Sequence, residues 1–87
     1  MNDRASELAP LVQTKNDFHE FLVALSQDFA ANATEWENSD LPSFLEALAS
    51  YSQDIQGYYT NTKQPVNAEV PSWRVFAEML CGARVYE

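Results

Sequence analysis

Residues 34–48 (TEWENSDLPSFLEAL) constrain the fold most strongly, because they hold a nearly complete set of helix-start signals. Asp40 or Ser39 is expected to cap the helix, since short polar side chains accept hydrogen bonds from free backbone N–H groups. Pro42 falls in the first turn, where its missing N–H costs nothing. Trp36 precedes the cap and is expected to fold back onto the first apolar side chains of the helix. A long helix is therefore predicted to begin at about residue 40.

Apolar side chains repeat at the helical spacing in three segments of the chain. The first segment follows Thr14 and Asp17, which form a capping-box variant, with Asn16 as the alternative cap. The second begins at about residue 40 and continues past Gly57, and the third opens at Ser72. No run of strand length alternates at period two. We therefore predict an all-α fold, a small three-helix bundle with helices at about 15–31, 40–59 and 72–86 and a long loop at 60–71.

A length of 87 residues suits one core, so residues 1–87 are treated as a single domain. Residues 1–13 show no lasting period and are expected to be mobile or to form a short helical turn. Trp36 and Trp73 are both expected to be largely buried. Gly82 is expected to let another helix approach closely, and Cys81 to be a small buried hydrophobe.

The net charge of −8 comes from one contiguous half of the chain. Residues 16–62 contain no Lys or Arg, whereas the acids and bases of the remaining residues balance. The acids of this half are Asp17, Glu20, Asp28, Glu35, Glu37, Asp40, Glu46 and Asp54. Phosphate contacts need clustered Lys and Arg, so neither nucleic acid nor an anionic membrane surface is expected as a partner. Such acids either keep a small protein soluble or attract a basic partner, and the sequence leaves both interpretations open.

The sequence holds no pattern typical of catalysis, of a metal site or of a cofactor site. Its two glycines do not form a phosphate-binding loop, and His19 has no second His or Cys at ligand spacing. His19 is therefore expected at the surface or at the edge of an apolar stripe. Glu35 and Glu37 are a close pair of acids, but nothing implies the unequal, water-excluding environments that acid–base catalysis needs. We expect a non-enzyme without cofactor or metal.

The expected location is the cytoplasm. No apolar run approaches the roughly 20 residues that span a bilayer. No basic-then-apolar leader opens the chain. The single cysteine cannot form an internal disulfide, whereas small secreted domains usually contain several.

Several short motifs are distinctive enough to indicate a family: WEN at 36–38, FLEAL at 44–48, PSW at 71–73 and the final YE at 86–87. From about Phe18 to Glu87, the chain resembles a family of small bacterial domains of unknown function. This resemblance implies a fold unit and a bacterial origin, and little chemistry. In size and acidity the chain also resembles immunity proteins, which neutralise secreted toxins.

Two functions of different classes follow. The first is an acidic, non-catalytic protein-binding domain, an immunity protein that neutralises a basic toxin such as a nuclease. The second is a housekeeping interaction module or self-associating helical module, in which the acids only solubilise the protein. The first predicts a surface that combines acids with tyrosines, which are common at interfaces. Its residues would be Glu35, Glu37, Asp40, Tyr51, Asp54, Tyr58 and Tyr59.

Overall fold

A computed structural model describes residues 3–87, which form helices joined by turns and loops and contain no strand. The helices are α1 (Arg4–Leu8), α2 (Lys15–Asn32), α3 (Leu41–Asn61) and α4 (Trp73–Ala83), with the 3₁₀ turns η1 (Ala9–Leu11) and η2 (Ala33–Glu35) after α1 and α2. The predicted all-α fold is confirmed, and the three long helices lie close to their predicted ranges. None of the helices in the described part of the chain is long and apolar enough to cross a bilayer.

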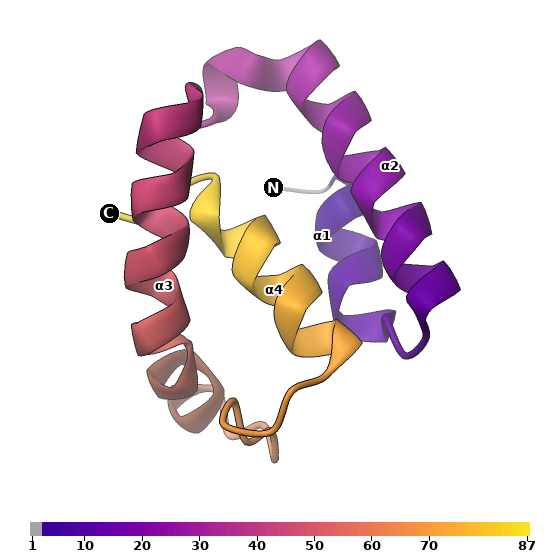
Figure 1. The fold of residues 1–87 in the computed structure, drawn as a ribbon, viewed down its shortest axis with the longest axis vertical. Coiled ribbons are helices and arrows are strands. Elements are labelled where there is room, and N and C mark those ends of the chain that lie inside the picture. The colour runs from indigo at the N-terminus through magenta and orange to yellow at the C-terminus, as the bar shows by residue number, and fades with distance from the viewer. Residues whose placement is uncertain (1–2) are drawn as a thin grey trace.

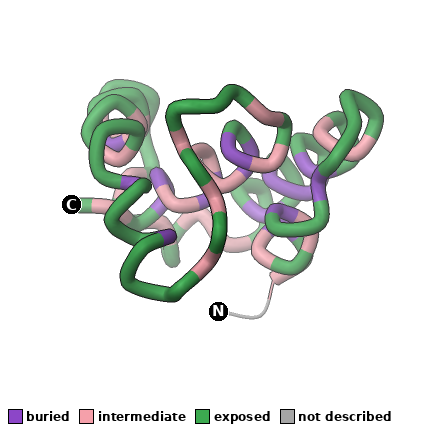
Figure 2. Tube along the Cα trace, turned by 90° about the horizontal axis from the view of Figure 1, so that it is seen from below, coloured by how far each residue is buried: buried purple, intermediate pink, exposed green. Residues whose placement is uncertain are grey.

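The central element of the fold is α4, which lies between α3 on one side and α1 with α2 on the other (Figure 1). α3 packs on α4, while α2 packs on both α1 and α4. Buried positions gather along the inner sides of the helices, and the outer side of α3 and much of the following loop are exposed (Figure 2). α4 is therefore the central helix, and the other helices pack on either side of it.

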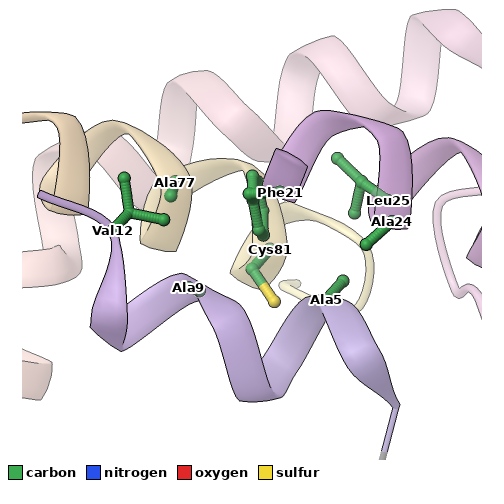
Figure 3. Close-up of a cluster of buried hydrophobic side chains, with 8 residues drawn as sticks. All are labelled: Ala5, Ala9, Val12, Phe21, Ala24, Leu25, Ala77 and Cys81. Atoms are coloured by element: carbon green, nitrogen blue, oxygen red, sulfur yellow. The ribbon is translucent and has the colours of Figure 1, made fainter. Parts of the chain in front are cut away.

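The larger core cluster joins α1, η1, α2 and α4 (Figure 3). Its members are Ala5, Ala9, Val12, Phe21, Ala24, Leu25, Ala77 and Cys81. Small side chains on α1 let its backbone lie close to α2 and α4, so this short helix is held by packing rather than by its own propensity. Of the two expectations for residues 1–13, the short helical turn is present, as α1 and η1. Residues 1 and 2 lie outside the described part.

The predicted starts of the long helices are confirmed by their caps. Asp40 Oδ1 accepts a hydrogen bond at 2.8 Å from the backbone N–H three residues on. Thr14 and Asp17 form the full capping box, with distances of 3.0 and 3.2 Å. Ser72 Oγ accepts from a backbone N–H of α4 at 3.1 Å. Each cap is local chemistry between residues three apart, and so it can be read from the sequence.

The ends of two helices differ from the prediction. α3 continues past Gly57, as predicted, but ends at Asn61 rather than at residue 59, and Lys63 follows with a φ of 57° in the left-handed region. Hydrogen bonds from Lys63 N–H to Thr60 O and from Gln64 N–H to Tyr59 O complete a Schellman motif there. α4 ends at Ala83 rather than residue 86, because a side chain from the segment before α3 binds its last carbonyl groups, as described below.

The prediction that both tryptophans are largely buried is wrong for Trp73, which is 38% exposed. α4 turns its small residues toward the core, and Trp73 lies at the edge, with its ring centroid 5.4 Å from that of Phe18. Trp36 is only half-buried. It stacks on Phe44 of α3 at 5.8 Å, which confirms the expected contact between the segment before the cap and the start of the helix.

Three single-residue expectations are confirmed. Cys81 is buried and His19 is exposed. Gly82 of α4 lies directly against the Tyr51 ring of α3, because a Cβ atom there would overlap that ring and lie only 2.8 Å from its Cδ2 atom. The Tyr51 ring packs in turn against Tyr86, with 4.8 Å between centroids.

Candidate protein-binding surface

Four acids lie along one flank of α3, where residues 37–38 and the end of the chain pack beside it. We call this surface the acidic flank, and its acids are Glu37, Glu46, Asp54 and Glu87. Three of them line a hollow of about 310 Å³ together with Asn38, Ser43, Ser50 and Tyr86. Asp54 joins the same surface because its carboxylate accepts a hydrogen bond from the hydroxyl of Tyr86. That bond also raises the pKa of Tyr86.

Asn38 builds the acidic flank by tying two distant segments together. Its side-chain Nδ2 donates to the carbonyl oxygens of Ala83 and Tyr86, each at 2.9 Å. Its backbone N–H donates to the carbonyl of Arg84 at 3.0 Å. These bonds satisfy carbonyl groups at the end of α4 and so end that helix before residue 86. They also hold Glu37 and Glu87 beside α3.

A buried ionic cluster fixes the position of this junction. Asp28 accepts hydrogen bonds from Trp36 Nε1 at 2.7 Å, Asn32 Nδ2 at 3.0 Å and Arg84 at 2.9 Å. Burial alone would raise the pKa of Asp28, but these hydrogen bonds outweigh it and hold the pKa below its ordinary value. Arg84 also lies 3.3 Å from Asp3. The cluster therefore joins α1, α2, the segment before α3 and the end of α4.

Sequence reasoning missed this cluster for a clear reason. The spacing of Asp28 and Asn32 by one helical turn is visible in the sequence, but Arg84 lies 56 residues away and only the fold brings it near. The cluster also affects the surface charge, because Arg84 is buried in it. A second base, Arg74, is paired with Glu78 at 2.9 Å. Two of the five bases are thus neutralised by internal acids. The other three bases, Arg4, Lys15 and Lys63, are exposed, on α1, at the start of α2 and just after α3.

The structure brings together some of the predicted binding residues. Glu37 and Asp54 both belong to the acidic flank, and Glu35 is exposed on η2. Asp40 is exposed but caps α3 and lines a different hollow. Glu46, which lies two helical turns before Asp54, could have been added from that spacing. Glu87 carries no such signal.

The three tyrosines predicted to bind a partner, Tyr51, Tyr58 and Tyr59, do not line the hollow of the acidic flank. Tyr51 and Tyr58 line a separate hollow of about 340 Å³ between α1 and α3, where burial raises the pKa of Tyr51 to about 12. Tyr59 is fully buried, and its hydroxyl donates to Glu78 at 2.8 Å. Burial and this carboxylate raise the pKa of Tyr59. The prediction that Tyr59 contacts a partner is therefore wrong, because its position on α3 faces α4.

The four acids are spread along the flank rather than aimed at one point. Within residues 3–87, no three His, Cys, Asp or Glu side chains converge as a metal site would require. The arrangement provides a broad negative field, and the aromatic ring of Tyr86 is among the side chains that line the hollow. Such a surface suits a charged macromolecule.

Comparison with protein families gives a match over residues 14–87 to a family of unknown function, DUF7660. The chain belongs to DUF7660. This confirms the predicted membership in a family of unknown function. The matched region of DUF7660 includes all of the acidic flank and leaves α1 outside. No curated protein and no solved structure matches the chain.

Proposed function

We propose that this DUF7660 protein is an acidic, non-catalytic protein-binding domain, and that it serves in the cytoplasm as an immunity protein against a basic toxin. The observation that carries the proposal is the acidic flank itself. Glu37, Glu46, Asp54 and Glu87 lie together on one surface, and residues 16–62 contribute no base that would offset them.

The mechanism follows from electrostatics. A protein that binds phosphates, such as a nuclease, carries a positively charged site, and carboxylates can occupy that site in place of phosphates. Complementary fields also raise the association rate toward roughly 10⁸–10⁹ M⁻¹s⁻¹ at low salt. The acidic flank would thus both attract the toxin and cover its active surface.

Tyr86 supplies the aromatic part of the proposed interface. It is half-buried, lines the hollow and is held by Asp54 and Tyr51, so its ring is already ordered before binding. Ordered aromatic side chains at the centre of an interface contribute much of its binding energy. Tyr86 therefore replaces Tyr59 in the proposed interface.

The test is a charge reversal with a matched control. Affinity purification at low salt identifies the partner, and the affinity of the purified pair is then measured at several salt concentrations. Glu37→Lys with Glu46→Lys should slow association and flatten the salt dependence. Glu20→Lys with Glu69→Lys makes the same change of charge at exposed positions outside the flank and should have a much smaller effect.

Toxin co-expression provides the functional readout. The Glu37→Lys, Glu46→Lys protein should fold and fail to protect the cell, while the control protein should protect it. Full protection by the flank variant would refute this placement of the interface. A protein that captures no basic partner and associates with itself would favour the self-associating module instead.

A further inference from the structure

The hollow that Tyr51 and Tyr58 line has the composition of a ligand site, and we call it the tyrosine hollow. Residues of α1, η1, α3 and α4 all contribute to it, and α1 and α3 lie on either side of α4 (Figure 1). Its volume of about 340 Å³ is at the small end of the range for small-molecule sites, which is roughly 300–1,000 Å³. It shares no lining residue with the hollow of the acidic flank, so the two sites are separate.

Two tyrosine side chains in this hollow have hydroxyl groups that are free to bind a ligand. The hydroxyl groups of Tyr51 and Tyr58 form no hydrogen bond within residues 3–87, whereas those of the other two tyrosines donate to acids. Tyr51 is nevertheless half-buried, since its ring packs against Gly82 and Tyr86. The hydroxyl of a tyrosine in such a position usually has a hydrogen-bond partner. Tyr51 therefore offers a ligand both an aromatic ring and a free hydroxyl.

Glu78 of α4 adds a carboxylate to the lining of the hollow. Its Oε1 accepts from the Tyr59 hydroxyl at 2.8 Å and from Arg74 Nε at 2.9 Å, while its Oε2 accepts no hydrogen bond in the described part of the chain. Arg74 does not line the hollow, so the carboxylate is the nearer charge to a molecule inside it. Only 11% of the Glu78 side chain is exposed, so water screens its charge weakly. Burial raises the pKa of Tyr51 to about 12, and the charge of Glu78 adds to this shift, so the field of Glu78 reaches Tyr51.

The hollow does not suit an anion, although Arg84 lines it. A guanidinium has five N–H groups, and four of those of Arg84 donate hydrogen bonds. The acceptors are Asp28, Ser6, and the sulfur and the carbonyl oxygen of Cys81. The fifth belongs to Nη1, which lies 3.3 Å from Asp3, so Arg84 has no donor to spare for a ligand.

A metal ion is also a poor fit to the hollow. Glu78 is the only carboxylate in the lining, whereas hard cations need several oxygen ligands. Pro10 and Val85 line the same hollow, and apolar side chains suit alkyl groups better than the water shell of a metal ion. The lining therefore favours a cation that carries its charge on an organic group.

We propose that the tyrosine hollow binds a small organic ammonium ion, held by the rings of Tyr51 and Tyr58 and by the carboxylate of Glu78. The negative face of an aromatic ring attracts such ions, and a shielded carboxylate adds to this attraction. The ammonium group belongs either to a free small molecule or to a lysine side chain of another protein. This inference goes beyond the proposed function, because it needs neither the acidic flank nor a toxin.

The test is an NMR titration with choline as the probe, since choline is a quaternary ammonium ion. Its methyl signal should move upfield on binding, because the methyl groups lie against aromatic rings. The control ligand is the neutral analogue of choline in which carbon replaces the ammonium nitrogen, and it should bind at least about fivefold more weakly. N-acetyl-trimethyllysine amide presents the same ammonium group as a protein side chain would.

Two variants alter the hollow, and each has a matched control. Tyr58→Leu and Glu78→Gln should each weaken choline binding by about fivefold. Both should fold, because Tyr58 is 44% exposed and a glutamine at position 78 can still accept from Tyr59. Phe29→Leu, at a position that is 40% exposed, and Glu46→Gln, in the acidic flank, make the same changes elsewhere and should alter binding by less than about twofold.

Three results would overturn the inference. They are no upfield shift at choline concentrations up to about 50 mM, equal binding of choline and its neutral analogue, and binding that Glu46→Gln weakens but Tyr58→Leu does not. The last result would place the cation on the acidic flank. If Tyr58→Leu and Glu78→Gln weaken binding as expected, the tighter of choline and the lysine derivative identifies the ligand as a free cation or as a protein side chain.

Discussion

Asp28 is the residue on which the acidic flank most depends, although it is not exposed. Its carboxylate holds Trp36, Asn32 and Arg84, and through them the segment that carries Glu37. We predict that Asp28→Asn lowers the free energy of unfolding by about 3 kcal/mol at pH 7, because it removes one partner of a buried ion pair. The value lies at the low end for such pairs because Asp3 remains 3.3 Å from Arg84. Urea unfolding measures the change, with the exposed Glu20→Gln as control.

The same residue gives a pH dependence. The pKa of Asp28 is lower in the folded protein than its ordinary value. Its contribution to stability is therefore complete above about pH 4 and is lost as the pH falls through the folded pKa. The difference in stability between the wild type and Asp28→Asn should narrow when unfolding is measured at about pH 3. A difference that stays constant from pH 7 to pH 3 would show that the charge of Asp28 is not what stabilises the junction.

The two glycines, Gly57 and Gly82, should respond in opposite ways to replacement by alanine. Gly57 is exposed near the C-terminal end of α3 with open space around it, so Gly57→Ala should stabilise the protein by about 0.5–1 kcal/mol. Gly82→Ala should destabilise it by about 1–3 kcal/mol, since the new methyl group would overlap the Tyr51 ring. Thermal unfolding of both variants checks the signs. If both variants changed the melting temperature in the same direction, the Tyr51 ring would not pack tightly against Gly82.

At the scale of the element, the end of α3 is strained at Lys63. A left-handed conformation costs a non-glycine residue roughly 1–2 kcal/mol, and the Schellman motif requires it here. Lys63→Gly should therefore raise the free energy of unfolding by about 0.5–1 kcal/mol, as the lost strain exceeds the added chain entropy. Lys63→Ala retains the strain and serves as the control. A loss of stability in Lys63→Gly would mean that the lysine side chain makes a contact more valuable than the relief of strain.

The elements also show which features can be predicted from sequence. The caps at Thr14, Asp40 and Ser72 are predictable because each involves residues three apart. The end of α3 is not, because a lysine in the position that glycine usually occupies gives no signal. α1 has a local cap, in which Asp3 Oδ1 accepts from Ser6 N–H at 2.8 Å, but it has no periodicity of its own, and Ala5 packs in the core formed with α2 and α4. The exposure of Trp73 depends on which side of α4 faces the core, and that is set by its two neighbours together.

For the whole molecule, the acidic half of the sequence could be recognised from composition, but its surface could not. Only the fold shows that Arg84 forms a buried ion pair with Asp28, and that Glu87 lies beside α3. The frequency of tyrosine at interfaces does not tell which of these side chains face a partner, and here α3 turns Tyr59 inward and places Tyr58 over another hollow.

The concentration of like charge on one flank should cost the whole molecule some stability. Glu37, Glu46 and Glu87 line one hollow, and their repulsion is weakened by salt. The melting temperature should therefore rise with added salt at pH 7, and Glu46→Lys at low salt should raise it by about 2–4 °C. The same variant should reduce the salt effect, while Glu20→Lys should change both quantities less. If Glu46→Lys stabilises the protein and also weakens partner binding, then the acids are retained for recognition at the expense of stability. If it leaves stability and salt dependence unchanged, the four acids do not act on one another, and the field proposed for the acidic flank is too weak to steer a partner.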